Sequence, residues 1–326
     1  MRTRRFSFPV FGCLVALATL TAGFCTTVRA DSPDPRVTFT QDDDAGTLTV
    51  QIDGQEAFVY QYGDQVDLTH IWPLRSPSGK NMLVQQTQPF PHHRALWFAD
   101  TVRLEGSERG RFYDAYHTGQ SGQPPFRDRI RHDRFTAVEP GAEGRYQEKL
   151  VWVMAHEIPT LDEQRDVRIV PLGNGEYLLD MVFTLTASYG DVEFVSDAVH
   201  YAWPYLRINE KFHGDNGGTI TNDRGQAGQA DTNMQPAQWI DYSNTVDGTA
   251  EGVAVFQWPD GQTRRWLTRE YGTFGPRRPD AQSGRPFTIP RDGTLSQRVG
   301  ILVHQGDVET GRVGERYEAY ISSSLP

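Results

Sequence analysis

Two adjacent histidines, His92 and His93, lie in the densest run of reactive side chains in this sequence, from Gln88 to Ala99. Imidazole exchanges protons near neutral pH, so either histidine could act as a general acid or base. Arg94 could bind an anionic group, and Trp97 could stack on a substrate. Because neighbours on a strand point to opposite faces, we expect at most one of the histidines in a given site. In the alternative interpretation, His92 caps a turn and Trp97 belongs to the core.

A second group of proton-transferring side chains follows in the segment 112–117. Tyrosine and histidine can abstract or donate protons where a substrate shields them from water. The candidate catalytic residues therefore also include four further side chains, Tyr113, Tyr116, His117 and His200. Trp203, close to the last of these, is a candidate for stacking on sugar, because a pyranose ring combines apolar CH faces with hydroxyl groups. Both segments could instead be strands whose aromatic side chains fill the core.

Arginines at alternate positions form a positive stripe if the segment 126–134 is extended. The stripe contains Arg127, Arg129 and Arg131, and Arg269 is a further candidate for substrate binding. Guanidinium groups bind carboxylate or sulfate through two parallel hydrogen bonds, so the stripe suits an acidic sugar polymer. The alternative is that these arginines pair with acidic residues on a solvated face.

Several catalytic signatures are absent from the sequence. It contains no G-x-S-x-G elbow, no Walker A loop, no G-x-G-x-x-G between strand and helix, and no H-E-x-x-H. The chain has nine histidines, which permit a metal site, but no pair has the spacing of a ligand set on one element. The sequence therefore predicts no cofactor, and the histidine spacing does not indicate a bound metal.

The first thirty residues have the composition of an export signal. Three arginines precede an apolar stretch, and Val-Arg-Ala before Asp31 fits a small-x-Ala cleavage site. We predict that residues 1–30 are a signal peptide and that residues 31–326 form a single domain, located in the periplasm or outside the cell. Cleavage removes four arginines and both cysteines, which changes the formal net charge from −10 to −14. The mature chain then has neither disulfides nor thiolate chemistry. An uncleaved membrane anchor is the alternative.

The composition also excludes two classes of partner. General nucleic-acid binding needs a basic surface to displace counterions, whereas this chain is acidic. No stretch after the signal is long and apolar enough to span a bilayer, so we expect no membrane span in the mature chain. With 37% hydrophobic residues, the chain can bury a sizeable core. The sequence does not indicate an oligomeric state.

Alternation of apolar and polar residues dominates the readable segments and predicts strands. The clearest are 145–155 and 177–187, the second with 192–203 as its expected hairpin partner. Shorter strands are predicted at 37–39, 47–52, 56–62, 101–104, 238–242, 252–258 and 297–304. Only the segment 313–321 has a helical period, and 213–231 is the longest expected loop.

These elements predict an all-β fold. Strands of ten or more residues need a broad opposing sheet to cover them. We therefore expect a large two-sheet antiparallel β-sandwich with a short C-terminal helix.

Four blocks of the sequence resemble a family of exported bacterial proteins, common among planctomycetes, that is catalogued as "methane oxygenase PmoA"-like. The most specific reads PHHRALWFADTV at 91–102, and the others are 125–132, 239–248 and 266–278. The resemblance implies a large sandwich similar to the sugar-binding mutarotase-like group (a supersandwich), and it supplies no catalytic residues. The family name refers to a membrane enzyme whose subunit spans the bilayer. Because the mature chain has no such segment, we do not expect a methane monooxygenase.

Together these observations predict an exported carbohydrate-active protein that binds a sugar or acidic glycan and acts on it by acid/base chemistry, as a lyase, hydrolase or epimerase. In a β-elimination, an arginine would neutralise a uronate, a histidine would abstract the acidified proton, and a tyrosine would protonate the leaving oxygen. The candidates for these three roles are Arg94 or Arg129, His92 or His93, and Tyr113 or Tyr116.

Two alternatives remain open from the sequence. One is a non-catalytic glycan-binding or cell-surface protein that uses the same residues. The other is a His-ligated metalloenzyme that uses His92 or His93 together with His117 and His200.

Overall fold

The burial pattern of the long strands explains the layered arrangement of this chain. The computed structural model describes residues 1, 37–113, 122–195, 202–262, 264–278 and 287–323. In strand β9 (Gly144–Met154), every second side chain from Tyr146 to Trp152 is buried, while Lys149 on the opposite face is exposed. A strand with one apolar face must be covered on that face, and a second sheet can supply the cover.

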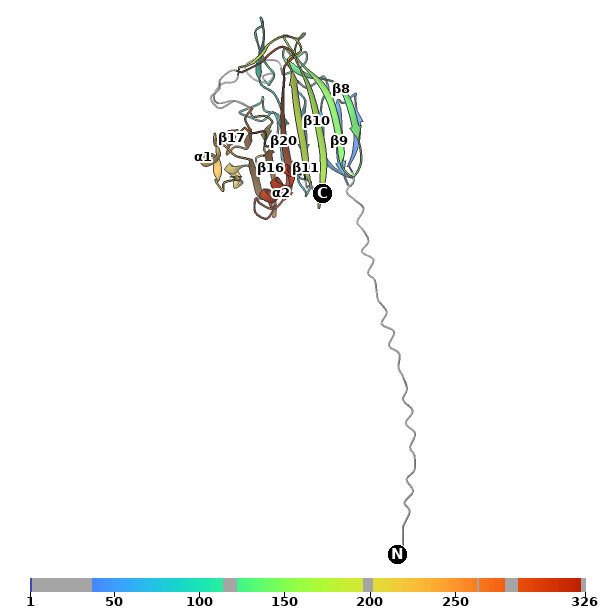
Figure 1. Cartoon of the computed structure of the whole chain (residues 1–326), viewed down its shortest axis with the longest axis vertical. Coiled ribbons are helices and arrows are strands. Elements are labelled where there is room, and N and C mark those ends of the chain that lie inside the picture. The colour runs from blue at the N-terminus through green and yellow to red at the C-terminus, as the bar shows by residue number, and fades with distance from the viewer. Residues whose placement is uncertain (2–36, 114–121, 196–201, 263, 279–286, 324–326) are drawn as a thin grey trace. The chain divides into compact units, whose positions relative to one another are not determined.

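Eight of the described strands form an antiparallel sheet that contains the longest elements. In spatial order they are β14 (Thr219–Asn222), β15 (Trp239–Val246), β16 (Thr249–Gln257), β20 (Thr294–Gln305), β11 (Glu176–Thr186), β10 (Ile158–Gly173), β9 and β8 (Arg129–Glu139). Figure 1 shows β20, β11, β10, β9 and β8 running side by side.

A second sheet of eight described strands carries most of the segments singled out above. In spatial order they are β1 (Val37–Asp42), β2 (Thr47–Ile52), β3 (Gln55–Gln61), β4 (His70–Leu74), β5 (Leu96–Trp97), β13 (Tyr205–Arg207), β18 (Thr273–Pro276) and β17 (Trp266–Arg269). The central strands of this sheet therefore come from three distant parts of the sequence.

The remaining described elements are short. A four-stranded sheet contains β19 (Phe287–Ile289), β12 (Val192–Phe194), β6 (Thr101–Leu104) and β7 (Arg109–Arg111). The helices are α1 (Gly228–Thr232), α2 (Val313–Ile321) and a 3-10 turn at Gly214–Asn216. No helix in the described part of the chain has the length and apolar character needed to cross a membrane.

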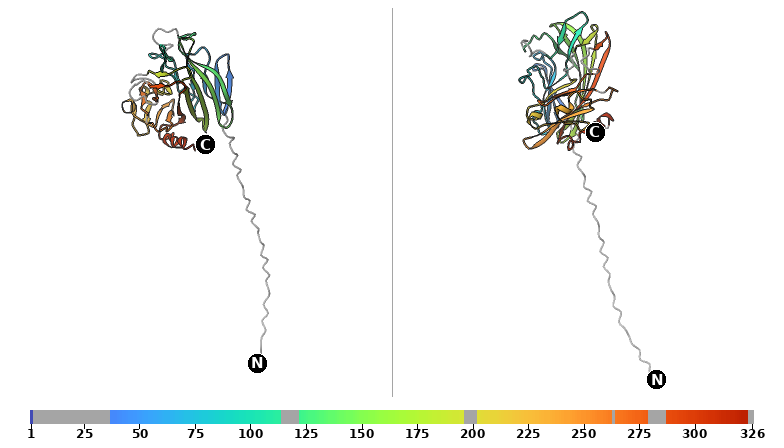
Figure 2. Two further views of the ribbon diagram at one scale, coloured as in Figure 1. Left: turned by 45° about the horizontal axis from the view of Figure 1, so that its top comes forward. Right: turned by 90° about the vertical axis from the view of Figure 1, so that its left-hand side faces the viewer.

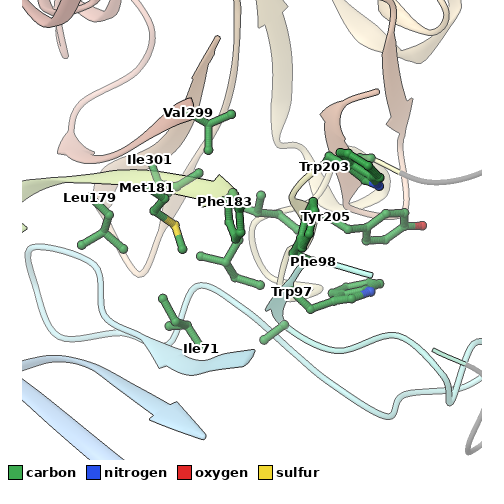
Figure 3. Close-up of a cluster of buried hydrophobic side chains, with 14 of the residues drawn as sticks. Ile71, Trp97, Phe98, Leu179, Met181, Phe183, Trp203, Tyr205, Val299 and Ile301 are labelled. Carbon is green, nitrogen blue, oxygen red and sulfur yellow. The ribbon is translucent and has the colours of Figure 1, made fainter. Parts of the chain in front are cut away.

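Aromatic and aliphatic side chains fill the space between the two large sheets (Figure 3). Phe98 stacks on Phe183 of β11 with a centroid separation of 4.4 Å and meets Trp203 edge-on at 4.8 Å. Tyr60 of β3 lies 5.4 Å from Tyr146 of β9, so the blue N-terminal strands pack against the green middle strands in Figure 2. These ring contacts join the two sheets into one core.

The predicted fold class is confirmed. Two large antiparallel sheets pack face to face, and the short helix α2 lies near the C-terminus. The strands predicted at 47–52 and 101–104 coincide with β2 and β6, and the predicted helix coincides with α2. The long strands β9 and β11 begin and end within one residue of their predicted bounds.

The predicted hairpin between 177–187 and 192–203 is wrong. In the described part of this segment only β12 is a strand, and it pairs with β6 and β19. Both edges of β11 are occupied by β10 and β20. The alternation of apolar and polar residues predicts which face of a strand is buried, but it does not predict which strand pairs with it. Similarly, the predicted loop 213–231 contains β14 and α1.

The longest strand, β10, has no counterpart among the predicted strands because its buried face carries charges. Glu163 and Arg165 are both 2% exposed. Nε and Nη2 of Arg165 donate hydrogen bonds to Glu163 Oε1, at 2.9 and 2.7 Å. Nη1 of Arg165 reaches the other sheet, where it donates to the hydroxyls of Tyr60 at 3.1 Å and Thr69 at 3.0 Å. Tyr60 in turn donates to the buried carboxylate of Glu148 on β9.

Replacing Arg165 with Met should strongly destabilise the protein. The substitution leaves the carboxylate of Glu163 buried without its cation and removes the hydrogen bond that Arg165 donates to Tyr60, which costs about 3–5 kcal/mol. Denaturant unfolding of Arg165→Met and of the exposed control Arg134→Gln measures the effect, and the control should change the free energy of unfolding by less than about 0.5 kcal/mol. Equal stability of the two variants would contradict the proposed role of the network.

A second buried ion pair lies between β15 and β20. His304 and Asp241 are both 0% exposed, and their Nε2 and Oδ1 atoms are 2.7 Å apart. Ser243 donates a hydrogen bond to the other carboxylate oxygen of Asp241 at 2.8 Å. Burial disfavours the charged imidazole, but the Asp241 carboxylate and its hydrogen bond outweigh burial, so the pKa of His304 is raised above 6.5.

This pair predicts a pH-dependent contribution to stability. Because the pKa of His304 is higher in the folded than in the unfolded chain, the contribution is complete below pH 6.5 and is lost as the pH rises through the folded-state pKa. Unfolding of the wild type and of His304→Gln at pH values on both sides of 6.5 tests this. The difference in free energy of unfolding between them should shrink as the pH rises, and a constant difference would contradict the prediction.

Candidate functional site

The central strands of the second sheet present different residues on their two faces. Tyr205 of β13 pairs with Trp97 of β5, and Leu206 pairs with Leu96. Paired residues share a face and consecutive residues alternate, so Trp97 and Tyr205 lie opposite the two leucines. Phe98, two residues after Leu96 and therefore on the same face, stacks on Phe183 of the facing sheet, so Leu96 points into the sandwich. Trp97 and Tyr205 lie together on the other side of the strands, with the Tyr205 hydroxyl directed away from Phe183 (Figure 3).

Both histidines of the sequence block lie beside this outer face. His92 and His93 are in a turn before β5, and their rings are 4.5 Å apart and nearly perpendicular. The expectation that strand alternation separates them is therefore wrong, because neither residue is in a strand. The backbone N–H of His93 donates to Phe90 O at 3.0 Å, which fixes the turn. Both imidazoles can thus contribute to one site.

Aromatic rings surround His93, which is 5% exposed. Its ring stacks on Phe90 at 4.9 Å and lies 5.7 Å from Trp97. Nε2 of His93 lies 3.4 Å from the hydroxyl of Tyr205, so the two side chains form a histidine–phenol pair. Phe90 also stacks on Tyr271, in the turn between β17 and β18, at 5.0 Å. We call Phe90, His93, Trp97, Tyr205 and Tyr271 the aromatic cluster.

The turn that carries Tyr271 lies close to β13. Gly272 has a φ of 94°, and a Cβ at this position would lie 2.9 Å from Ile208 O. Ile208 N also donates to Gly272 O at 2.7 Å. Only glycine accommodates both the left-handed backbone and this close approach. The turn therefore holds Tyr271 over the residues that follow Tyr205.

Arg207 lies beneath Tyr271 and forms no ion pair with an acid among the described residues, although the carboxylate of Asp215 acts on its charge from farther away. Its guanidinium carbon is 4.8 Å from the centroid of the Tyr271 ring, and the residue is 6% exposed. Nε and Nη1 are buried without a hydrogen-bond partner in the described chain. Burial lowers the pKa of Arg207, yet guanidinium remains charged in proteins. A desolvated cation with unused donors is costly to the apo protein and is suited to an anionic ligand.

Two further titratable side chains face Arg207. Burial raises the pKa of Tyr205, so its phenol carries a proton at neutral pH and can donate it. Burial, aided by the charge of Arg207, lowers the pKa of His213, which favours the neutral imidazole. The site therefore combines the buried positive charge of Arg207 with a phenol that holds its proton.

Trp203 belongs to a neighbouring buried group. Its Nε1 donates to Asp100 Oδ2 at 3.2 Å, and Arg278 Nε lies 3.6 Å from the same oxygen. Burial raises the pKa of Asp100 to about 6, against the opposing charges of Arg278 and Arg277. Trp203 is 1% exposed and packs between Phe98 and other core rings. This position agrees with the core alternative for Trp203.

The arginines expected to bind substrate are largely engaged with acids. Arg94 and Asp67, each 1% exposed, form a buried ion pair. Arg127 pairs with Asp128 at 2.8 Å and with Glu108 at 3.0 Å.

Two further arginines of this set lie on β8, and one lies on β17. Arg129 pairs with Asp64 at 3.2 Å. Arg131 is exposed. Arg269 donates to Asn233 Oδ1 at 2.6 Å.

The remaining predicted catalytic residues divide into two groups. Tyr113 is described: its hydroxyl is 3.1 Å from Thr101 Oγ1, and its ring is 6.3 Å from His92. Tyr116, His117 and His200 lie outside the described residues. Within the described ranges, no group of three His, Cys, Asp or Glu side chains is placed to hold a metal ion.

Sequence reasoning did not include Arg207, Tyr205 and His213 among the candidates. The available signal was the spacing of Tyr205 and Arg207, which places both on the same face of an extended segment. Periodicity alone could not identify which face was buried in the sandwich, since both faces of β13 are buried. Only the folded structure shows that Tyr271 contacts Arg207 and that His93 contacts Tyr205.

The fold and the site define an antiparallel β-sandwich protein with a cationic, aromatic site on the outer face of one sheet. The chain belongs to a family of unknown function, DUF6807, whose model matches residues 47–318. This match does not test the resemblance to the PmoA-like family, which stays a prediction. No match was found among curated proteins.

Several solved structures are similar to this chain at low sequence identity. An α-galactosidase from Lactobacillus brevis has 10% identity and a TM-score of 0.45, over 83% of this chain and 40% of that chain. A galactose 1-epimerase from Lactobacillus acidophilus has 10% identity and a TM-score of 0.37, over 83% of this chain and 98% of that chain. A heparinase III gene product has 10% identity and a TM-score of 0.34, over 83% of this chain and 36% of that chain. This chain therefore spans well under half of the galactosidase, and its function has to be argued from the site.

Replacing Arg207 with Met should stabilise the protein in the absence of ligand. Methionine fills a similar volume without a desolvated charge, so the free energy of unfolding should rise by about 1–2 kcal/mol. Denaturant unfolding of this variant beside Arg165→Met provides the contrast, since both changes remove a buried guanidinium. A loss of stability as large as that of Arg165→Met would show that the folded chain itself satisfies Arg207.

Proposed function

We propose that this chain is an exported carbohydrate-active protein that binds an acidic glycan on the outer face of β5 and β13 and cleaves it by β-elimination. The observation that supports the proposal is Arg207, a buried guanidinium with two donors that no described residue uses. Export is expected from the first thirty residues, and it would place the protein where bacterial and plant polysaccharides are found.

A uronate would satisfy the chemistry of this site in two ways. Its carboxylate could accept two parallel hydrogen bonds from the guanidinium of Arg207, which replaces water that the buried group has lost. Its ring has CH faces that can pack on the half-buried rings of Phe90 and Tyr271. A neutral sugar would leave the charge of Arg207 unpaired, so the proposal favours acidic over neutral glycans.

The same geometry supports an acid/base reaction at the carbon next to the carboxylate. Arg207 would stabilise the negative charge that develops on the carboxylate when the C5–H bond breaks. His93 in its neutral form would take this proton, and Tyr205 would give its own proton to the oxygen that leaves C4. The C5–H and C4–O bonds break, a C4=C5 double bond forms, and the proton on His93 returns to Tyr205 through their hydrogen bond or through water.

Activity on a panel of polysaccharides tests this proposal. Wild-type protein is assayed on polygalacturonate, alginate, chondroitin and a neutral glucan, by the ultraviolet absorbance of the unsaturated product. We expect turnover of at least one acidic polymer and none of the glucan. His93→Ala and Tyr205→Phe should each lower kcat by about 10²–10⁴-fold, since each removes a proton-transfer group. Arg207→Met should abolish preference for acidic ligands.

The control is Arg134→Gln, which removes an exposed charge from β8 and should leave the activity unchanged. If the protein binds acidic glycans but cleaves none of the polymers, it is a glycan-binding protein and not an enzyme. A protein that binds neutral and acidic glycans equally well, or whose binding is unaffected by Arg207→Met, would contradict the proposal itself.

A further inference from the structure

An arginine-lined cavity opens beside the small sheet, away from Arg207. It has a volume of about 720 Å³ and is lined by four arginines and two acids, Arg103, Arg109, Arg111, Arg127, Glu108 and Asp128. The lining residues come from β6, β7, the turn between these two strands and the segment just before β8. A cavity of this size can hold one or two sugar rings.

The described residues that line the cavity include more arginines than acids, although the chain is acidic. Its four arginines outnumber its two acids, whereas the whole chain has a formal net charge of −10. Arg127 engages both acids, at 3.0 Å for Glu108 and 2.8 Å for Asp128. Arg103 meets Glu193 at 3.5 Å, with both side chains more than one third exposed, so this pair is weak. Arg109 is exposed, and the described residues provide no ion pair for it.

A row of rings leads from Arg207 toward this cavity. Tyr271 lies over Arg207 at 4.8 Å, and Phe90 stacks on Tyr271 at 5.0 Å. His92 is 6.2 Å from Phe90, and Tyr113 is 6.3 Å from His92.

The row ends beside the cavity. Tyr113 follows β7, and Arg111, the last residue of β7, lines the cavity. Each of these rings is partly exposed, so the row offers some apolar surface between Arg207 and the arginine-lined cavity.

We propose that the cavity is a second anion-binding subsite, which takes a further carboxylate or a sulfate group of the glycan whose uronate pairs with Arg207. This inference rests on the proposed function and makes it more specific. The substrate would be an oligosaccharide or polymer with acidic groups on more than one ring, and a single uronic acid would occupy only the Arg207 site. Affinity should therefore increase with chain length for acidic glycans.

Calorimetric binding of dimers and hexamers prepared from polygalacturonate and chondroitin sulfate tests the second subsite. Under conditions that stop turnover, such as the His93→Ala background, we expect the hexamers to bind more tightly than the dimers. The double variant Arg103→Gln/Arg109→Gln should bind hexamers about tenfold more weakly and leave dimer affinity unchanged. The single variant Arg109→Gln should show part of this loss, since this side chain is exposed and forms no ion pair with the described residues. Sulfated and unsulfated hexamers distinguish the two anionic groups.

The matched control removes two charges elsewhere. Arg134 and Lys149 are exposed neighbours on β8 and β9, and neither lines the cavity. The variant Arg134→Gln/Lys149→Gln should keep the affinity for hexamers, and thermal unfolding checks that all variants are folded. An unchanged hexamer affinity in Arg103→Gln/Arg109→Gln would overturn the second subsite while leaving the Arg207 site intact. If the wild type binds neither length, the proposed function fails and the subsite fails with it.

Discussion

Burying a charge costs free energy, and this cost determines which partners the buried arginines of this molecule need. Arg165 lies between the two large sheets, and it is tolerated there because Glu163 and the hydroxyls of Tyr60 and Thr69 use its donors. The hydrogen bonds to Tyr60 and Thr69 reach from one sheet to the other, so the network helps to fix how the sheets face each other. Arg94 follows the same rule through its ion pair with Asp67. Arg207 differs, because two of its nitrogen atoms are buried without a hydrogen-bond partner among the described residues, and we therefore propose that a ligand binds it.

The sandwich and the site share a strand, and this explains why the site is rigid. On β13, Leu206 packs in the interior while Tyr205 and Arg207 lie on the opposite face. Backbone pairing with β5 and β18 fixes both sets of side chains at once. The turns that carry His93 and Tyr271 then close over the outer face, each held by backbone hydrogen bonds. A site supported in this way loses little conformational entropy when a ligand binds.

The distribution of charge suits an acidic ligand despite the negative net charge of the chain. Most of the arginines that the sequence made conspicuous are paired with acids, including Arg127 and Arg129. Two places remain as candidates for an acidic ligand, the buried Arg207 and the arginine-lined cavity formed by β6, β7, the turn between them and the segment before β8. The net negative charge of the chain disfavours anions that make only non-specific contacts, so the proposed binding depends on these two places and their geometry.

The sequence by itself determined the fold class, the long strands β9 and β11 and the helix α2, because alternation and helical period are local consequences of burying one face. It also identified the block around His93. It could not give the pairing of β12, because neighbours in a sheet need not be neighbours in the chain. It did not predict β10, because the buried charged residues Glu163 and Arg165 interrupt the alternation of apolar and polar residues. Only the tertiary structure decided that Arg207 is buried without an acid and beneath Tyr271, since burial and partnership depend on residues more than sixty positions apart.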